Sequence, residues 1–218
     1  MWTNPQTPNP ADFLTFVYAQ GVPQADLPSG VLPGASIDTS GNLTSTSATG
    51  TIAVGMAVVL STLVPYEYIL TWNGTTFTGT VSPAPQTAIS DQTLDVYTPS
   101  LLWAFQYAFD RCLKGTGYIP ASTYVPALYN LGMHQLLKIG QDQSDQTFFA
   151  DMRSQYKLLS FTGGVVTSAS DQNTASTVTV PDLFKNLNLS NLDLLKTPWG
   201  REYMGYAMNF GPYIVGMS

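Results

Sequence analysis

The chain has 218 residues and a formal net charge of −6 at pH 7; only 10% of its residues are charged, and 44% are hydrophobic. Ordinary soluble domains carry roughly 25% charged residues, so the composition favours a subunit packed against neighbours, although a stable secreted β-rich protein has a similar one. It excludes a disordered polyelectrolyte, and the lack of a basic run argues against direct nucleic-acid binding.

The single cysteine and the N-terminal residues narrow the class of protein further. Cys112 is the only cysteine, which excludes an internal disulfide and a thiolate zinc site. Residues 1–5 have neither a basic start nor an apolar core, so the sequence predicts no signal peptide. Residues 50–66 are too short and too rich in Thr, Gly and Pro to span a bilayer. We expect synthesis in a cytosol-like compartment, followed by incorporation into an assembly.

The first predicted element is a short helix that begins after Asn9. Asn9 can cap the helix, Pro10 suits its first position, and Asp12 places an acid in its first turn. The turn at 21–23 ends it. We therefore assign residues 1–30 to an N-terminal arm with a first helix.

Residues 31–96 have the pattern of β-structure. Bulky and small side chains alternate over 51–58, and bulky residues recur at every second position over 66–72. Asn73-Gly74, followed by a Thr-rich run, is a strong hairpin signal, because both residues accept positive φ. We predict an inserted β-domain at 31–96.

Three helices are predicted after this β-rich stretch. The first starts at Thr98-Pro99, the second covers about 122–139 and stops at Gly140, and the third starts near Ser144. Apolar side chains recur on one face of each helix, and polar links join them. This pattern suits a small antiparallel bundle.

The C-terminal part contains a predicted hairpin and further helices. Two Val- and Thr-rich runs flank a polar tip at about 163–180, which predicts a long hairpin. A short helix starts near Pro181, and a final helix starts at Thr197-Pro198. The expected fold class is α+β: a small antiparallel helical bundle with a long hairpin and an inserted β-rich unit. Residues 97–218 would form the helical core with its hairpin and C-terminal arm.

No set of residues has the spacing of a catalytic or metal site. His134, the only histidine, fits a helical histidine satisfied by a local hydrogen bond. Asp142, Asp145 and Asp151 fit helix capping better than a calcium or catalytic role. Neither a Gly-x-Ser-x-Gly elbow nor a phosphate loop is present. We predict a protein without enzymatic activity, metal or cofactor.

Aromatic residues suggest two interaction surfaces. The aromatic residues near the C-terminus could fill the core beneath a terminal helix, and they could also anchor an interface with another subunit. The two roles are compatible. The candidate subunit or partner interface consists of Val165, Val166, Asp171, Gln172, Trp199, Arg201, Tyr203, Phe210, Pro212 and Tyr213. A candidate β-domain contact surface consists of Tyr66, Tyr68, Trp72 and Phe77. If this second surface binds glycans, the chain belongs to a different class, the surface-binding modules.

Four segments resemble the head–tail connector (adaptor) proteins of tailed bacteriophages. They are YNLG at 129–132, FFADMR at 148–153, GVVTSASDQ at 164–172 and LKTPWGR at 195–201. The combination of the last two is the most specific part. The resemblance covers about 10–28 and 97–218 and leaves the β-rich stretch unexplained.

The resemblance implies a non-enzymatic virion structural protein. Copies of the chain would form a ring, usually a dodecamer, that sits beneath the portal protein at the neck, extends the DNA channel and docks tail or neck proteins. DNA would pass without specific binding, which suits an acidic chain with few Lys and Arg. Capsid or fibres are candidate partners of the β-domain, no membrane is involved, and the protein would be made in the host cytoplasm. A tail-terminator or another neck or baseplate component is the alternative.

Overall fold

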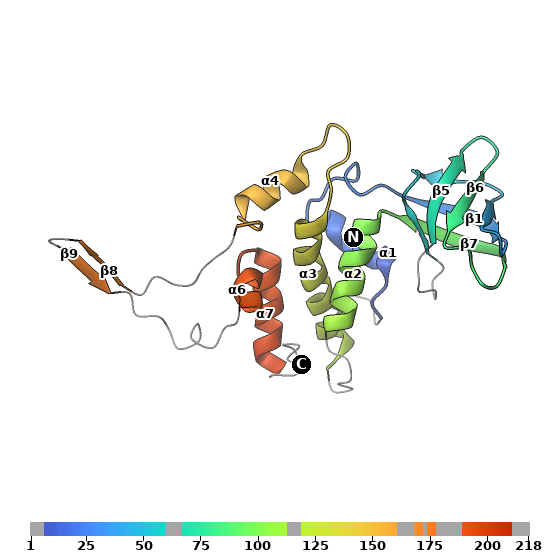
Figure 1. The fold of residues 1–218 in the computed structure, drawn as a ribbon. Helices are drawn as coiled ribbons and strands as arrows, with labels where there is room; N and C mark the ends of the chain where they lie inside the picture. Colours follow the sequence, from blue (N-terminus) through green and yellow to red (C-terminus); the bar gives the residue numbers. More distant parts are fainter. Residues whose placement is uncertain are drawn as a thin grey trace.

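The strands between Ser29 and Tyr97 close into an antiparallel barrel at one end of the structure (Figure 1). The computed structural model describes residues 7–59, 67–112, 119–160, 168–171, 174–177 and 189–210. The six barrel strands are β1 (Ser29–Ile37), β2 (Asn42–Thr44), β4 (Ala57–Val59), β5 (Glu67–Asn73), β6 (Thr78–Ser82) and β7 (Ile89–Tyr97). They pair in the order β2-β6-β5-β4-β7-β1, and β1 pairs back onto β2. A further short strand, β3 (Thr49–Gly50), adds to β1.

The bend in β1 allows the barrel to close. Its pairing with β7 shifts register between Leu32 and Ala35 and again before Ile37, and the part after the bend also pairs with β2. Gly34 lies at this bend with φ +57°, a conformation that glycine adopts without steric penalty. One strand can therefore bond to two neighbours and close the ring.

The barrel interior is a hydrophobic core of its own. A barrel of this size is filled by side chains that point inward from alternate strand positions. The buried residues of this core are Leu32, Ala35, Ile37, Leu43, Met56, Val58, Ile69, Val81, Leu94 and Val96.

Six helices in the described ranges build a second core beside the barrel. They are α1 (Pro10–Ala19), α2 (Pro99–Arg111), α3 (Ala121–Ile139), α4 (Phe148–Gln155), α6 (Leu189–Leu194) and α7 (Pro198–Phe210). Phe13 on α1 packs against Tyr129 on α3, with 5.4 Å between ring centroids. A Cβ at Gly132 would lie 2.8 Å from the Phe13 ring, so glycine permits this close approach.

The helices separate the barrel from the C-terminal elements (Figure 1). Helices α2 and α3 stand in the middle, the barrel lies on one side, and α4, α6 and α7 lie on the other. A two-stranded antiparallel hairpin, β8 (Ser168–Asp171) and β9 (Thr174–Thr177), lies farthest from the barrel. The structure is therefore elongated, with different elements at its two ends.

The predicted fold class, a small antiparallel helical bundle with a long hairpin and an inserted β-rich unit, is wrong. The chain instead combines a closed six-stranded antiparallel barrel with six described helices. Closure depends on the pairing of β1 with β7 and of β2 with β6, strands that are distant in sequence. Alternation of side chains indicates a strand but not which strands pair, so this closure could not be read from local pattern.

Two of the predicted strand patterns also differ from the structure. Residues 51–56 form a loop rather than a strand, and only Ala57–Val59 pair as β4. In β5 the fully buried residue is Ile69, whereas Leu70, assigned to the bulky face, is exposed. The pairing of β5 with β6 shifts register between Ile69 and Thr71, and a bulge of this kind breaks the two-residue alternation.

The predicted hairpin at Asn73-Gly74 is confirmed, with a different loop. Strands β5 and β6 pair on either side of residues 74–77, and positive φ falls on Phe77 (52°) rather than on Gly74. The Asn73 Oδ1 accepts hydrogen bonds from the backbone N–H groups of Thr75 and Thr76. An Asx turn therefore replaces the expected two-residue turn.

A predicted helix start agrees with the structure where the capping side chain directly precedes the helix, as at α1. Asn9 Oδ1 accepts from the Asp12 N–H at 2.8 Å, which caps α1. The third predicted helix begins later than expected, at Phe148 rather than near Ser144, because the Asp142 carboxylate accepts from the Phe149 and Ala150 N–H groups at 2.6 and 3.0 Å.

Candidate interaction surfaces

A buried polar contact holds α7 against α3. His134, only 2% exposed, has its Nδ1 2.8 Å from Thr197 Oγ1. The Thr197 hydroxyl also accepts from the Gly200 N–H at 2.9 Å and so caps α7. The Nε2 of the same ring faces the Asp193 carboxylate at 3.5 Å, and this acceptor favours a proton on Nε2, while the Thr197 hydroxyl can donate to Nδ1. The prediction of a local hydrogen bond for His134 is therefore wrong: its partner is 63 positions away in the sequence, at the start of α7.

Asp193 is the centre of this network. Its carboxylate lies 2.6 Å from Lys138 Nζ and 3.3 Å from Lys196 Nζ, in addition to the contact with His134. The hydrogen bond from His134 and the two ammonium groups lower the pKa of Asp193 well below its usual range. Lys196 Nζ also donates to the Ser160 carbonyl at 2.8 Å. The segment before α7 is thus tied both to α3 and to the residues that follow α4.

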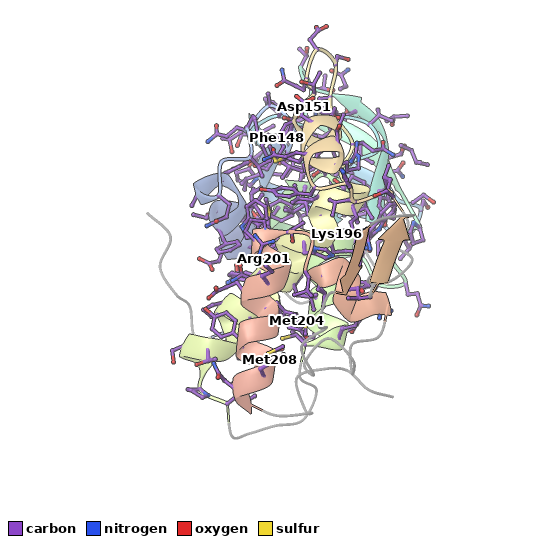
Figure 2. All side chains as sticks on the ribbon, turned by 90° about the vertical axis from the view of Figure 1, so that its left-hand side faces the viewer. Phe148, Asp151, Lys196, Arg201, Met204 and Met208 are labelled. Carbon is purple, nitrogen blue, oxygen red and sulfur yellow. The ribbon has the colours of Figure 1, made fainter. Side chains whose placement is uncertain are left out.

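The face of the molecule opposite the barrel is formed by α4 and α7. Figure 2 looks at this face and shows Phe148 and Asp151 on α4 above Arg201 and Met208 on α7, with Lys196 just before α7. Arg201 is exposed, and its Nη1 donates to the Leu195 carbonyl at 2.9 Å. This face therefore combines fixed cationic groups with apolar side chains.

Of the four predicted interface residues on α7, the three with described side chains have different surroundings. Trp199 is half-buried; its Nε1 donates to Gln20 Oε1 at 3.0 Å, and its ring meets Tyr156 edge-on. Arg201 is exposed. Tyr203 is only 4% exposed, and burial raises the pKa of its hydroxyl. In the single subunit, Trp199 and Tyr203 therefore contribute to the helical core, and Arg201 remains available at the surface.

The other residues of the predicted interface carry little structural information. Asp171 ends β8 opposite Thr174, and Phe210 ends α7; for both, the structure describes the backbone alone. Val165, Val166, Gln172, Pro212 and Tyr213 lie outside the described residues.

The predicted contact surface on the β-domain does not come together as one aromatic surface. The Tyr68 hydroxyl accepts from Trp103 Nε1 at 3.1 Å, and its ring packs against the helical core. Trp72 packs against the barrel core instead. Phe77 lies in the β5–β6 loop, and Tyr66 lies outside the described residues. The described aromatic residues thus belong to different parts of the fold.

Sequence reasoning missed a hollow of about 300 Å³ where the barrel meets the helices. Val54 and Trp103 form its walls and are 64% and 54% exposed. The lining residues are Pro28, Ala53, Val54, Gly55, Met56, Thr98, Pro99, Ser100, Trp103, Ile139, Gln141 and Gln143. The sequence did contain one signal for this hollow. Trp103 follows the buried Leu102 on α2 and lies outside the apolar face of that helix, so a large aromatic side chain is left exposed.

Two of the three clustered carboxylates, Asp142 and Asp151, lie at the start of α4, whereas Asp145 is exposed in the preceding loop with φ +64°. Asp142 caps α4 and also lies 3.7 Å from Arg153 Nη2, and Asp151 accepts from Thr147 Oγ1 at 2.9 Å. Within the described ranges no group of three or more His, Cys, Asp or Glu side chains could hold a metal ion. Among the helices that the structure describes, none combines the length and apolarity that a membrane crossing requires.

Another carboxylate, that of Asp26, supports no helix end in the described structure. Asp26 is fully buried, and neither of its oxygens has a hydrogen-bond partner among the described residues. Burial raises the pKa of its carboxyl; the nearby Gln143 backbone opposes this, and the Asp142 charge adds to it.

Comparison with known proteins found no family model, no curated protein and no solved structure that matches this chain.

Proposed function

We propose that this chain is a virion structural protein of a tailed bacteriophage, a connector subunit that forms a ring beneath the portal and docks the tail or neck. The motifs at 164–172 and 195–201, which resemble connector proteins, are the starting point. The second of these motifs begins α7, where Thr197 caps the helix and contacts His134. The motif therefore serves a definite structural purpose in this chain, which is to fix α7 on the helical core.

The observation that carries the proposal is the placement of different elements at the two ends of an elongated subunit (Figure 1). A ring subunit needs two different patches, one for each neighbour, and an arm or face for the next component. The barrel lies at one end, and the β8–β9 hairpin with the α4–α7 face lies at the other. In the proposed ring the helices form the wall, and the hairpin and C-terminal arm reach to the neighbouring proteins.

The composition supports an assembly of this kind. Only 10% of the residues are charged, and several large apolar side chains are exposed on the single subunit, among them Trp103, Leu159 and Met208. Such side chains gain stability when a neighbour covers them. The net charge of −6 also suits a channel wall along which DNA passes without being held.

The test combines electron microscopy with mass spectrometry. The purified full-length chain should give closed rings in electron micrographs, and native mass spectrometry should give the number of copies. The chain should also be present in the virions of a phage that encodes it, at the copy number of the ring. The proposal fails if the chain is monomeric at the highest soluble concentration and is also absent from virions. A ring at the distal end of the tail would support the tail-terminator or baseplate alternative.

A further inference from the structure

We propose that copies of this chain join head to tail, with Leu159 of one copy seated in the hollow between Val54 and Trp103 of the next. The inference rests on the proposed function, because it specifies the contact that would build the ring. It commits to a second copy of this chain as the partner of both surfaces.

Leu159 is held on a rigid turn. It is 77% exposed, more than the other exposed large apolar residues of the described chain. The preceding residue, Leu158, is buried in the helical core and anchors the turn. Lys157 adopts φ +50°, and its carbonyl accepts from the Ser160 hydroxyl at 2.7 Å and from the Ser160 N–H at 3.2 Å. Because Lys196 also bonds the Ser160 carbonyl, the position of Leu159 is fixed before any partner binds.

The hollow is also held in shape. Trp103 Nε1 donates to the Tyr68 hydroxyl, which fixes the indole ring that forms one wall. The Gly55 N–H donates to the Ile69 carbonyl at 2.8 Å, which fastens the loop carrying Val54 to β5. None of the lining residues is charged. The lining combines the polar Thr98, Ser100, Gln141 and Gln143 with an apolar wall formed by Val54 and the Trp103 ring. This wall is the part that a Leu side chain would contact, and Trp is a frequent anchor of protein interfaces.

The two surfaces lie on opposite sides of the molecule. The hollow lies at the junction of the barrel with α2 and α3. The Leu159 turn follows α4, and the carbonyl of its Ser160 is bonded by Lys196, which lies on the face away from the barrel that Figure 2 shows. One copy therefore presents both surfaces and cannot satisfy them within itself. Contacts between two different patches add subunits in one direction, and they give a ring when the rotation closes.

The charges are arranged to favour this pairing over other orientations. The barrel strands and their loops, residues 29–97, contain the acidic Asp38, Glu67, Asp91 and Asp95 and not one Lys or Arg. The opposite face carries charges of both signs, since Lys196 is paired with Asp193 and Asp151 and Glu202 are exposed like Arg201. The cation next to Leu159 itself is the exposed Lys157. Bringing the Leu159 turn to the hollow places Lys157 near a barrel that has no Lys or Arg of its own, whereas joining two barrels would bring like charges together.

The test uses chemical cross-linking of the full-length chain. Val54→Cys and Leu159→Cys are introduced together, and the protein is treated with a short bismaleimide at high concentration. The only native cysteine, Cys112, is buried and does not compete. If Leu159 of one copy meets Val54 of the next, denaturing gels show a ladder of covalent oligomers up to the ring size. Each single-cysteine variant gives a monomer or at most a dimer.

The matched control pairs Val54→Cys with Met208→Cys. Met208 is 48% exposed and lies nine residues after Trp199 on α7, which is about 13 Å along the helix axis. This pair should give no ladder. A second variant, Leu159→Asp, should weaken self-association about tenfold or more while the monomer unfolds at the same urea concentration, and Leu159→Met should retain association.

The possible outcomes separate the inference from the proposed function. Absence of a ladder with Val54→Cys and Leu159→Cys overturns the inference, as does an equal ladder with the Met208 pair. Native mass spectrometry of the unmodified chain then decides the second question. Rings without the ladder leave the connector proposal standing with another interface, such as one in which capsid or tail protein covers the hollow. A monomer that is also absent from virions removes both.

Discussion

His134 and Thr197, 63 positions apart in the sequence, meet at 2.8 Å between the imidazole Nδ1 and the hydroxyl Oγ1. The same hydroxyl caps α7 by accepting from the Gly200 N–H. One oxygen atom therefore both caps α7 and links its start to α3, and α7 forms part of the face shown in Figure 2.

Replacing this hydroxyl should destabilise the fold. Thr197→Val keeps the shape of the side chain but removes the cap and leaves His134 Nδ1 without its partner. We expect a loss of about 2 kcal/mol in the free energy of unfolding, from the cap and from the unpaired buried nitrogen. Urea unfolding followed by circular dichroism measures it. Thr197→Ser, which retains the oxygen, is the control and should lose clearly less; equal losses in the two variants would contradict this account.

The contrast between this helix start and its partner shows what could be predicted from the sequence. The start at Thr197-Pro198 was predictable because capping involves residues within one helical turn. The contact with His134 was not, since it joins residues on two helices that lie far apart in the chain. Local signals placed α1, α3 and the β5–β6 hairpin for the same reason.

The closed barrel and the hollow were beyond prediction for a related physical reason. Both arise where distant segments meet: β1 pairs with β7 and β2 with β6, and the hollow is lined by a barrel loop, α2 and the residues after α3. The sequence placed Tyr203 and Arg201 in one predicted interface, yet Tyr203 is buried and Arg201, two positions earlier on α7, is exposed. Exposure depends on which face of a helix is covered, and α3 covers α7 through contacts that the local pattern does not encode.

The low pKa of Asp193 predicts a pH-dependent contribution to stability. Its folded pKa lies below the ordinary value of 3.8, so the unfolded state binds the proton more readily than the folded one. The contribution is therefore complete above pH 3.8 and is lost as the pH falls through the folded value. Asp193→Asn should lower the free energy of unfolding by about 1.5–3 kcal/mol at neutral pH, the range for hydrogen bonds to a charged group.

Urea unfolding over a range of pH measures this effect. The difference between the wild type and Asp193→Asn should shrink as the pH falls below 3.8, because protonation removes the charge that Lys138 and Lys196 neutralise. Glu202→Gln, which changes an exposed carboxylate on α7, is the matched control and should leave the profile nearly unchanged. A difference that stays constant with pH would show that the network does not act through the Asp193 charge.

Asp26 should have the opposite effect on stability. Burial raises the pKa of this carboxyl, so the folded state holds the proton more tightly than the unfolded chain does. The ionised form therefore destabilises the fold above the folded pKa, and this penalty disappears as the pH falls. Asp26→Asn should raise the free energy of unfolding at neutral pH, because the buried amide carries no charge to desolvate.

The Asp26 variant also has a defined control. At a pH below 3.8, where the unfolded carboxyl is protonated as well, the gain should vanish or reverse, because the amide is then compared with a neutral acid. Asp91→Asn, at an exposed barrel position, should change stability little at either pH. Loss of stability at neutral pH on Asp26→Asn would mean that the carboxylate has a favourable partner in the folded protein.

Cys112 should be unreactive in the folded protein. Its thiol is fully buried where α2 ends, and burial raises its pKa to about 12, so almost no thiolate exists at neutral pH. We expect Ellman's reagent to titrate no thiol in the native chain and one thiol per chain in concentrated urea. With Val54→Cys as the control, one thiol should react natively and two after unfolding, since Val54 is exposed. Rapid native labelling of the wild type would show that α2 opens at this end, and the cross-linking experiment would then require Cys112→Ala as its background.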